Sequence, residues 1–267
     1  MRRAAPLVRA GEGLGSCLSV DVARDGAVAI VRIDRQEALN ALNVETLTLL
    51  RDRLQELAGL TEVRAVVLTG AGEKAFVAGA DIKYMSGLAP EQARGWGALG
   101  HEAGRLLETM PKPTIAAING FALGGGCELA LACDLRYASS RAKLGQPEIN
   151  LGIVPGWGGT QRLARLCGIG VAKDLIFTGR TVDAEEALRI GLVSAIADPV
   201  LDRALETAQE LAAKSTVALS LAKRLINLSP GALETEADQF GELFSSEDAK
   251  EGLSAFAEKR APKFSGR

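Results

Sequence analysis

The sequence contains a single histidine, His101, in 267 residues. A zinc or iron site made of several histidines is therefore excluded, and Ser-His-Asp or Cys-His catalysis would depend on that one residue. His101 lies in a predicted helix from Ala93 to Leu107, and no Ser or Cys motif is tied to it. We expect a surface or structural role for this side chain, and no metal site.

Cysteines, long apolar runs and excess charge are also scarce. The four cysteines form no CxxC pair and lie mostly among apolar neighbours, a pattern typical of reduced, buried thiols in a cytosolic protein. No uninterrupted apolar run reaches the roughly 18–20 residues that span a bilayer. A net charge of −2 gives no general affinity for nucleic acid or a membrane surface. We expect neither partner, and a cytoplasmic location, or the mitochondrial matrix if the source is eukaryotic.

The composition that is present, 47% hydrophobic and 24% charged residues, is typical of a folded globular protein. This length fits one domain with a helical appendage. Residues 1–16 are basic up to Glu12 and contain no real hydrophobic segment, so they are predicted to be a flexible leader. We expect an α/β core over 17–200 and a C-terminal helical region over 201–267.

The first part of the predicted core alternates strands and helices. Alternating apolar residues on both sides of Asp25-Gly26 predict a hairpin. A 3.6-residue apolar period predicts a helix from Val44 to Leu60. Buried strands are expected at Arg64–Gly70 and Thr114–Gly120, with further elements at Gly124–Cys133 (helix) and Leu135–Ala138 (strand). This alternation indicates an α/β fold with a partly parallel sheet.

Beyond Thr160 the sequence predicts mainly helices. Thr160 is a plausible N-cap, and another helix is expected to begin at Val182. The remaining helices are expected at Ala204–Ala213, Thr216–Ile226, Gly231–Phe244 and Ser246–Lys259.

Two glutamates, twenty positions apart, lie in glycine-rich turns. Glu128 ends the run Ala-Leu-Gly-Gly-Gly-Cys-Glu, and Glu148 ends Gly-Gln-Pro-Glu, just ahead of a second glycine-rich segment over 152–162. A pair of carboxylates is what acid/base chemistry on a carbon acid needs, because one can give a proton while the other takes one. The glycines before Glu128 allow a ligand to approach the backbone closely and leave an N–H group free for an oxyanion.

A second small-residue turn, Ala-Gly-Ala-Asp over 78–81, leaves the N–H of Ala80 uncovered. Taken alone, this turn could simply be a tight connection capped by Asp81. Together with the turn over 124–126, it offers two backbone donors from separate loops, which is the minimum for an oxyanion hole.

These motifs resemble the crotonase (enoyl-CoA hydratase/isomerase) family. Four segments follow that family's order and spacing, namely 35–41, 75–83, 118–128 and 145–162. The resemblance extends from about residue 18 to 264. It implies a core of repeated ββα units with two nearly perpendicular sheets. It also implies a C-terminal helical region that forms trimers, with two trimers often making a hexamer.

The resemblance further implies roles for individual residues. The backbone N–H groups of Ala80 and Gly125 would bind the oxygen of an acyl-CoA thioester. Glu128 would help to activate water, and Glu148 would deliver a proton to the α-carbon. Coenzyme A is part of the substrate, so no separate cofactor is implied. The residues expected to line the substrate are Ala38, Ala78, Asp81, Ile82, Lys83, Met85, Gly156 and Trp157, with Lys259 reaching a neighbouring subunit's CoA.

Two positions depart from the family pattern. Glu37 stands where many relatives have a lysine that meets the CoA phosphates. Trp157 is large for its glycine-rich loop, so it either shortens the acyl pocket or packs in the core. With Tyr84 and Met85 near the other turn, the bulk of these side chains predicts a preference for short acyl chains.

The leading hypothesis is a 2-enoyl-CoA hydratase, because both carboxylates are present and many isomerases of the family keep only one. An isomerase or another acyl-CoA lyase is the first alternative, and a pseudoenzyme is another. An RNA-binding relative would use a basic helix, but in the helix over 44–60 Arg51 and Arg53 alternate with Asp52 and Glu56.

Overall fold

The strands of this protein form two sheets, as the computed structural model shows for residues 19–228 and 233–267. The predicted leader over 1–16, Cys17 and the predicted helix start at Gly231 lie outside these described residues. The strands are β1 Val20–Asp25, β2 Val28–Ile33, β3 Ala65–Gly70, β4 Ala75–Val77, β5 Thr114–Ile118, β6 Phe121–Leu123, β7 Leu135–Ala138, β8 Lys143–Gly145, β9 Thr181–Asp183 and β10 Ala195–Ile196. The α-helices are α1 Val44–Gly59, α2 Ile82–Met85, α3 Pro90–Thr109, α4 Gly125–Ala132, α5 Gly159–Cys167, α6 Ile169–Thr178, α7 Ala184–Arg189, α8 Val200–Ala212, α9 Thr216–Ile226, α10 Leu233–Leu243 and α11 Glu247–Ala257, with 3-10 turns η1 Gln36–Ala38 and η2 Pro147–Leu151.

The larger sheet has six strands in the order β1-β2-β3-β5-β7-β10. Strands β1 and β2 form the predicted antiparallel hairpin, and the later neighbours are parallel. Every residue of β3 and β5 is buried, which explains why these strands appear in the sequence as continuous apolar runs. The predicted partly parallel α/β sheet is confirmed.

From β3 to β8, consecutive strands alternate between the two sheets. The smaller sheet has the order β4-β6-β8-β9, so each of β3, β5 and β7 in the larger sheet is followed by a strand of the smaller one. Helices follow β4 and β6 directly, and η2 and α5 follow β8. This is the repeated ββα plan that the resemblance implies, and it gives the smaller sheet three parallel strands whose ends lie side by side.

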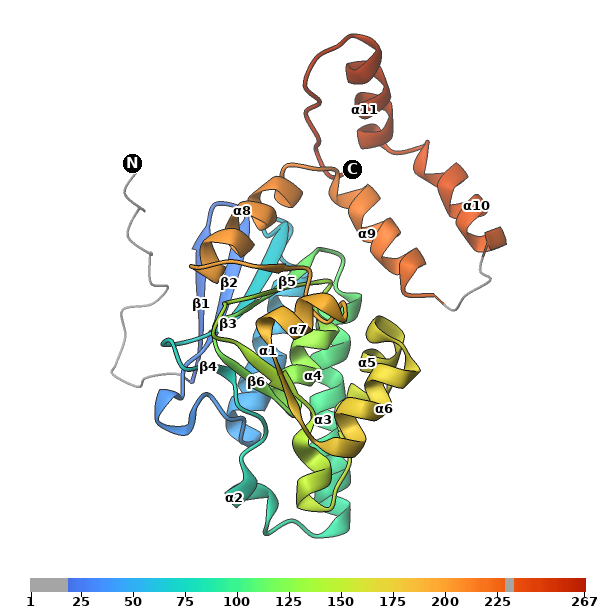
Figure 1. The fold of residues 1–267 in the computed structure, drawn as a ribbon. Coiled ribbons are helices and arrows are strands. Elements are labelled where there is room, and N and C mark those ends of the chain that lie inside the picture. Colours follow the sequence, from blue (N-terminus) through green and yellow to red (C-terminus); the bar gives the residue numbers. More distant parts are fainter. Residues whose placement is uncertain (1–18, 229–232) are drawn as a thin grey trace.

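Helices cover both faces of the larger sheet. Helix α8 packs on one face, where Ala204 and Ala208 join a cluster with Val67. The alternate residues of the same strand, Val66 and Leu68, belong to the main core beneath α1 and α3. Helices α9 to α11 extend away from this body (Figure 1).

Two predicted helix starts are wrong. Helix α5 begins at Gly159 with Gly158 as its N-cap, so Thr160 lies inside the first turn and is not the cap. Val182 lies in strand β9, which pairs with β8, and helix α7 begins only after Asp183, whose carboxylate accepts from the N–H of Glu186. The predicted helix over 93–107 exists and extends to Pro90–Thr109.

Candidate active site

The predicted site residues come from the loops that follow three parallel strands of the smaller sheet. Strand β4 leads to Ala80, β6 leads to Gly125 and Glu128, and β8 leads to Glu148. Because parallel neighbouring strands end at the same edge of a sheet, these loops lie together. A Cβ atom built on Gly79 would be 3.2 Å from the carbonyl oxygen of Leu123, so the first two loops touch.

The backbone around Ala80 is fixed by a short parallel bridge to Leu42. Leu42 donates its N–H to the oxygen of Gly79 at 2.9 Å and accepts from the N–H of Asp81 at 2.7 Å. These bonds use the groups on either side of Ala80. The N–H of Ala80 therefore points away from Leu42, as a donor to a ligand requires.

The three glycines before Glu128 are required for different reasons. Gly124 has φ +52°, which favours glycine, and a Cβ on Gly126 would be 2.0 Å from the oxygen of Val77. Gly125 is the first residue of α4, so its N–H is one of those at a helix N-terminus with no partner inside the helix. This end of a helix dipole also favours negative charge.

Glu128 is almost fully buried in the first turn of α4. Its Oε1 accepts two backbone hydrogen bonds, from the N–H of Trp157 and from the N–H of Gly159, each at 2.7 Å. Burial raises the pKa of this carboxyl, while the two N–H groups and the charge on Arg162 act in the opposite direction. The turn over 157–159 therefore holds this carboxylate in place and favours its ionised form.

Glu148 is also buried, in the turn η2 after β8. Burial raises the pKa of Glu148 to about 7, and the nearby charge of Glu128 adds to the shift. One of its oxygens would be 2.9 Å from a Cβ on Gly124, so the carboxyl lies against the loop that opens α4. The two glutamates are thus brought together as predicted.

Gln146 contacts Glu148 and was not among the predicted site residues. Its side chain is fully buried, and the amide orientation that suits its surroundings donates to both oxygens of Glu148, at 3.1 and 3.2 Å. The signal was available, since an amide two residues before the glutamate sits in the same glycine-rich turn.

The side chain of Trp157 packs in the core. It is 4% exposed, and its ring lies where a Cβ on Gly100 of α3 or on Gly125 would be within 2.3 Å. The ring also makes an edge contact with Trp96, which in turn contacts Tyr84, both at 5.1 Å between centroids. Trp157 therefore both fills the core and backs the residue predicted to supply an oxyanion donor.

The residues expected along CoA lie mostly in one neighbourhood. The N–H of Ala78 donates to Leu39, just after Ala38, and Asp81 lies 3.6 Å from the guanidinium of Arg35. Asp81 also caps α2, which contains the three predicted residues Ile82, Lys83 and Met85. The predicted Gly156 is exposed, directly before Trp157.

Lys259 does not join this neighbourhood within one chain. It is exposed and follows α11, which lies at the opposite end of the molecule from α2 (Figure 1). A contact between Lys259 and CoA would have to come from another copy of the chain.

The described residues contain neither a metal-ligand cluster nor a membrane-spanning helix. Over residues 19–228 and 233–267, no three His, Cys, Asp or Glu side chains gather as metal ligands would. No helix in this part of the chain has the length and apolarity to cross a membrane.

Known proteins resemble this chain over nearly its whole length. The enoyl-CoA hydratase/isomerase family model matches residues 23–267. A short-chain-enoyl-CoA hydratase of Clostridium acetobutylicum is 50% identical over 249 residues, covering 91% of this chain and 95% of that protein. A crotonyl-CoA hydratase of Syntrophomonas wolfei is 46% identical over 248 residues, covering 90% and 95%. The crystal structure of an enoyl-CoA hydratase from Bacillus anthracis has a TM-score of 0.89 at 40% identity, covering 93% of this chain and 100% of that chain. The chain therefore belongs to the enoyl-CoA hydratase/isomerase family, which confirms the predicted resemblance and its fold.

Proposed function

We propose that this protein is an enoyl-CoA hydratase, which adds water across the double bond of a 2-enoyl-CoA to give a 3-hydroxyacyl-CoA. The predicted activity agrees with the names of the two relatives that are 50% and 46% identical to it. Both names refer to short or four-carbon substrates, and we extend that preference to this chain as part of the proposal.

The backbone N–H groups of Ala80 and Gly125 would bind the thioester oxygen. As the oxygen of water bonds to the β-carbon, electrons move onto the thioester oxygen. The two fixed N–H donors stabilise the resulting enolate. Removal of one such donor typically costs about 2.7–4 kcal/mol of transition-state stabilisation. Glu128 would take a proton from the attacking water, and Glu148 would give one to the α-carbon, so one water molecule is added in total.

The observation that carries this assignment is the unequal environment of the two carboxyls. Burial raises the pKa of both carboxyls, but at Glu128 two backbone N–H groups and the charge of Arg162 oppose this rise and favour the ionised form, as a base requires. The pKa of Glu148 is raised to about 7, so this group can hold a proton near neutral pH, as an acid requires.

A panel of 2-enoyl-CoA and 3-enoyl-CoA thioesters, followed for hydration and for double-bond migration, tests the proposal. We expect crotonyl-CoA or a near homologue to be hydrated faster than any 3-enoyl substrate is isomerised. Migration without hydration would show that the isomerase alternative is correct.

We also propose that the chain works as a trimer or a dimer of trimers. Helices α9 to α11 expose large apolar side chains, including Ile226 at 74%, Phe256 at 87% and the contacting pair Phe240 and Phe244. Such a surface needs a partner. In a trimer, Lys259 of one copy would be able to reach the CoA bound by a neighbouring copy. Light scattering that returned a 27.9 kDa monomer at micromolar concentration would reject this. The cytoplasmic location remains a prediction.

A further inference from the structure

Arg162 lies in the first turn of α5, close enough to Glu128 for its charge to act on that carboxyl. Its Nη1 donates to the carbonyl oxygen of Trp157 at 2.7 Å. The N–H of that same Trp157 donates to Glu128. One arginine therefore binds the turn that supplies the hydrogen bonds of the predicted base.

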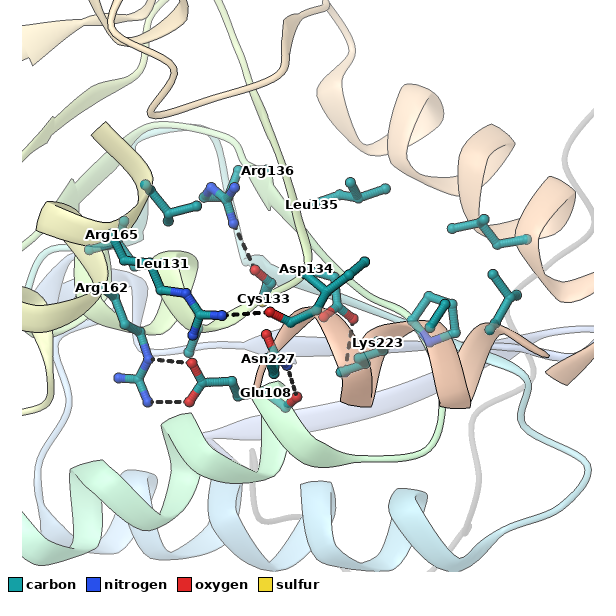
Figure 2. A pocket seen from close by; sticks show the side chains of 17 residues that line it. Glu108, Leu131, Cys133, Asp134, Leu135, Arg136, Arg162, Arg165, Lys223 and Asn227 are labelled. Carbon is teal, nitrogen blue, oxygen red and sulfur yellow. Dashed lines mark hydrogen bonds and ion pairs between the residues drawn. The ribbon is translucent and has the colours of Figure 1, made fainter. Parts of the chain in front are cut away.

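The rest of the guanidinium is bound by Glu108, near the end of α3. Nε and Nη2 donate to the two carboxylate oxygens of Glu108 at 3.3 and 2.9 Å, and both side chains are mostly buried (Figure 2). This bidentate geometry fixes the orientation of the guanidinium plane. Helix α3 thus sets the position of an arginine that belongs to α5.

Two glycines make room for this arrangement. A Cβ on Gly104 of α3 would be 3.2 Å from Nη1 of Arg162, and one on Gly158 would be 2.3 Å from the same atom. Gly158 also has φ +107°, a conformation that side chains disfavour. The guanidinium therefore occupies a close-fitting space between α3 and the turn over 157–159.

We propose that Arg162, held by Glu108, is a positioning residue for Glu128. It fixes the turn so that the N–H groups of Trp157 and Gly159 point at one carboxylate oxygen. Its positive charge favours the ionised base. This inference rests on the proposed function of Glu128.

The other titratable groups around Glu128 are few in the described part of the chain. Glu148 of η2 has a like charge when ionised, and the buried thiol of Cys127 has its pKa raised mainly by burial, so it stays neutral. Glu108 reaches Glu128 only through Arg162. Arg162 is therefore the nearby cation whose loss would disfavour the charged form of Glu128.

The first test measures hydration of crotonyl-CoA against pH by Arg162→Met and Arg162→Lys. We expect Arg162→Met to lower kcat about 10- to 100-fold. KM should stay within about threefold of the wild-type value, because the lost hydrogen-bonded charge does not contact the substrate. The acid limb of kcat should move to higher pH, because the pKa of the base rises when the cation is removed. Arg162→Lys keeps the charge but lacks the planar fork that binds Glu108 at two points while reaching Trp157, so kcat should fall while the acid limb moves less.

Arg180→Met is the matched control, because Arg180 also binds two acids, Asp174 and Glu186, on the surface. We expect it to keep the wild-type kcat and pH profile. Wild-type kcat and an unshifted acid limb in Arg162→Met would overturn the proposal, and so would an equal loss in the control.

A second readout does not depend on activity. Carbon-13 NMR of labelled glutamate carboxyls, with Glu128 assigned through Glu128→Gln, should give a higher titration midpoint for Glu128 in Arg162→Met, and an unchanged midpoint would overturn the proposal. If the wild-type protein failed to hydrate any enoyl-CoA, the proposed function would be wrong, while this midpoint would still decide the role of Arg162.

Discussion

The turns that carry Glu128 and Glu148 have the same plan and different surroundings. Each follows a strand of the smaller sheet, contains glycine or proline and buries its carboxyl. Burial raises the pKa of both carboxyls, but at Glu128 two backbone N–H groups and the charge of Arg162 oppose the rise, whereas at Glu148 a neighbouring negative charge adds to it and the pKa reaches about 7. The difference teaches that the same residue type is fitted for giving or for taking a proton by what lies within a few ångströms of it.

The strongest test of this comparison replaces each glutamate with glutamine. Glu128→Gln and Glu148→Gln should each lower kcat by about 100- to 10,000-fold, because each removes one half of the proton transfer. The double variant should be little worse than either single one, since the two groups act as a unit. Glu91→Gln, at an exposed position in α3, is the control. Wild-type turnover in either single variant would refute the two-carboxylate mechanism.

A smaller effect is expected from crowding the Glu128 turn. Gly125→Ala places a Cβ 2.3 Å from the ring of Trp157 and should lower the free energy of unfolding by about 1–3 kcal/mol. In a Trp157→Ala background the ring is gone, so the added methyl group should cost much less. Urea unfolding of the four proteins measures this coupling. Additive losses would mean that the ring and Gly125 are not in contact.

The raised pKa of Glu148 should make the free energy of unfolding depend on pH. A carboxyl whose pKa is raised from 4.5 to about 7 contributes stability that is fully present below 4.5 and lost as pH rises through 7. Glu148→Gln removes this loss. The change that it causes in the free energy of unfolding should therefore be more favourable at pH 8 than at pH 4, by an amount on the order of 2 kcal/mol. Urea unfolding at both pH values measures the difference. An equal effect at both would contradict the raised pKa.

The smallest expected effect concerns acyl chain length. The ring of Trp157 packs in the core against Gly125, the predicted oxyanion donor, so Trp157→Ala opens space beside the proposed thioester site and should shift the preference of kcat/KM toward longer chains. Each extra buried methylene is worth about 0.8 kcal/mol, nearly a factor of four. The measurement compares four-carbon and twelve-carbon substrates in both proteins. Equal efficiency on both in the wild type would show that the ring does not limit the pocket.

The sequence predicted most of the two turns because their signals are local. Buried runs such as Thr114–Ile118 and the glycines before Glu128 need no distant partner to be recognised. The start of α5 at Gly159 was missed because the turn is arranged around a carboxylate about thirty residues earlier. Strand β9 was missed for a similar reason, since it is defined by pairing with β8.

The contacts that prepare the site were the least predictable part. Arg162 is one of many arginines in the sequence, and its link to Glu108 depends on α3 and α5 lying together. The packing of Trp157 depends on Gly100, more than fifty residues away in sequence. Spacing along the chain carries no information on either contact.

The alternation of strands between two sheets has a consequence for how such a protein diverges. The three parallel strands β4, β6 and β8 are held by backbone pairing, which depends little on side-chain identity. The loops after these strands supply separate parts of the proposed chemistry, since the first carries a donor, the second a donor with the base, and the third the acid. Side-chain substitutions in one loop therefore leave the backbone pairing beneath all three loops intact. Descendants of one ancestor can change their chemistry one loop at a time while inheriting the same scaffold.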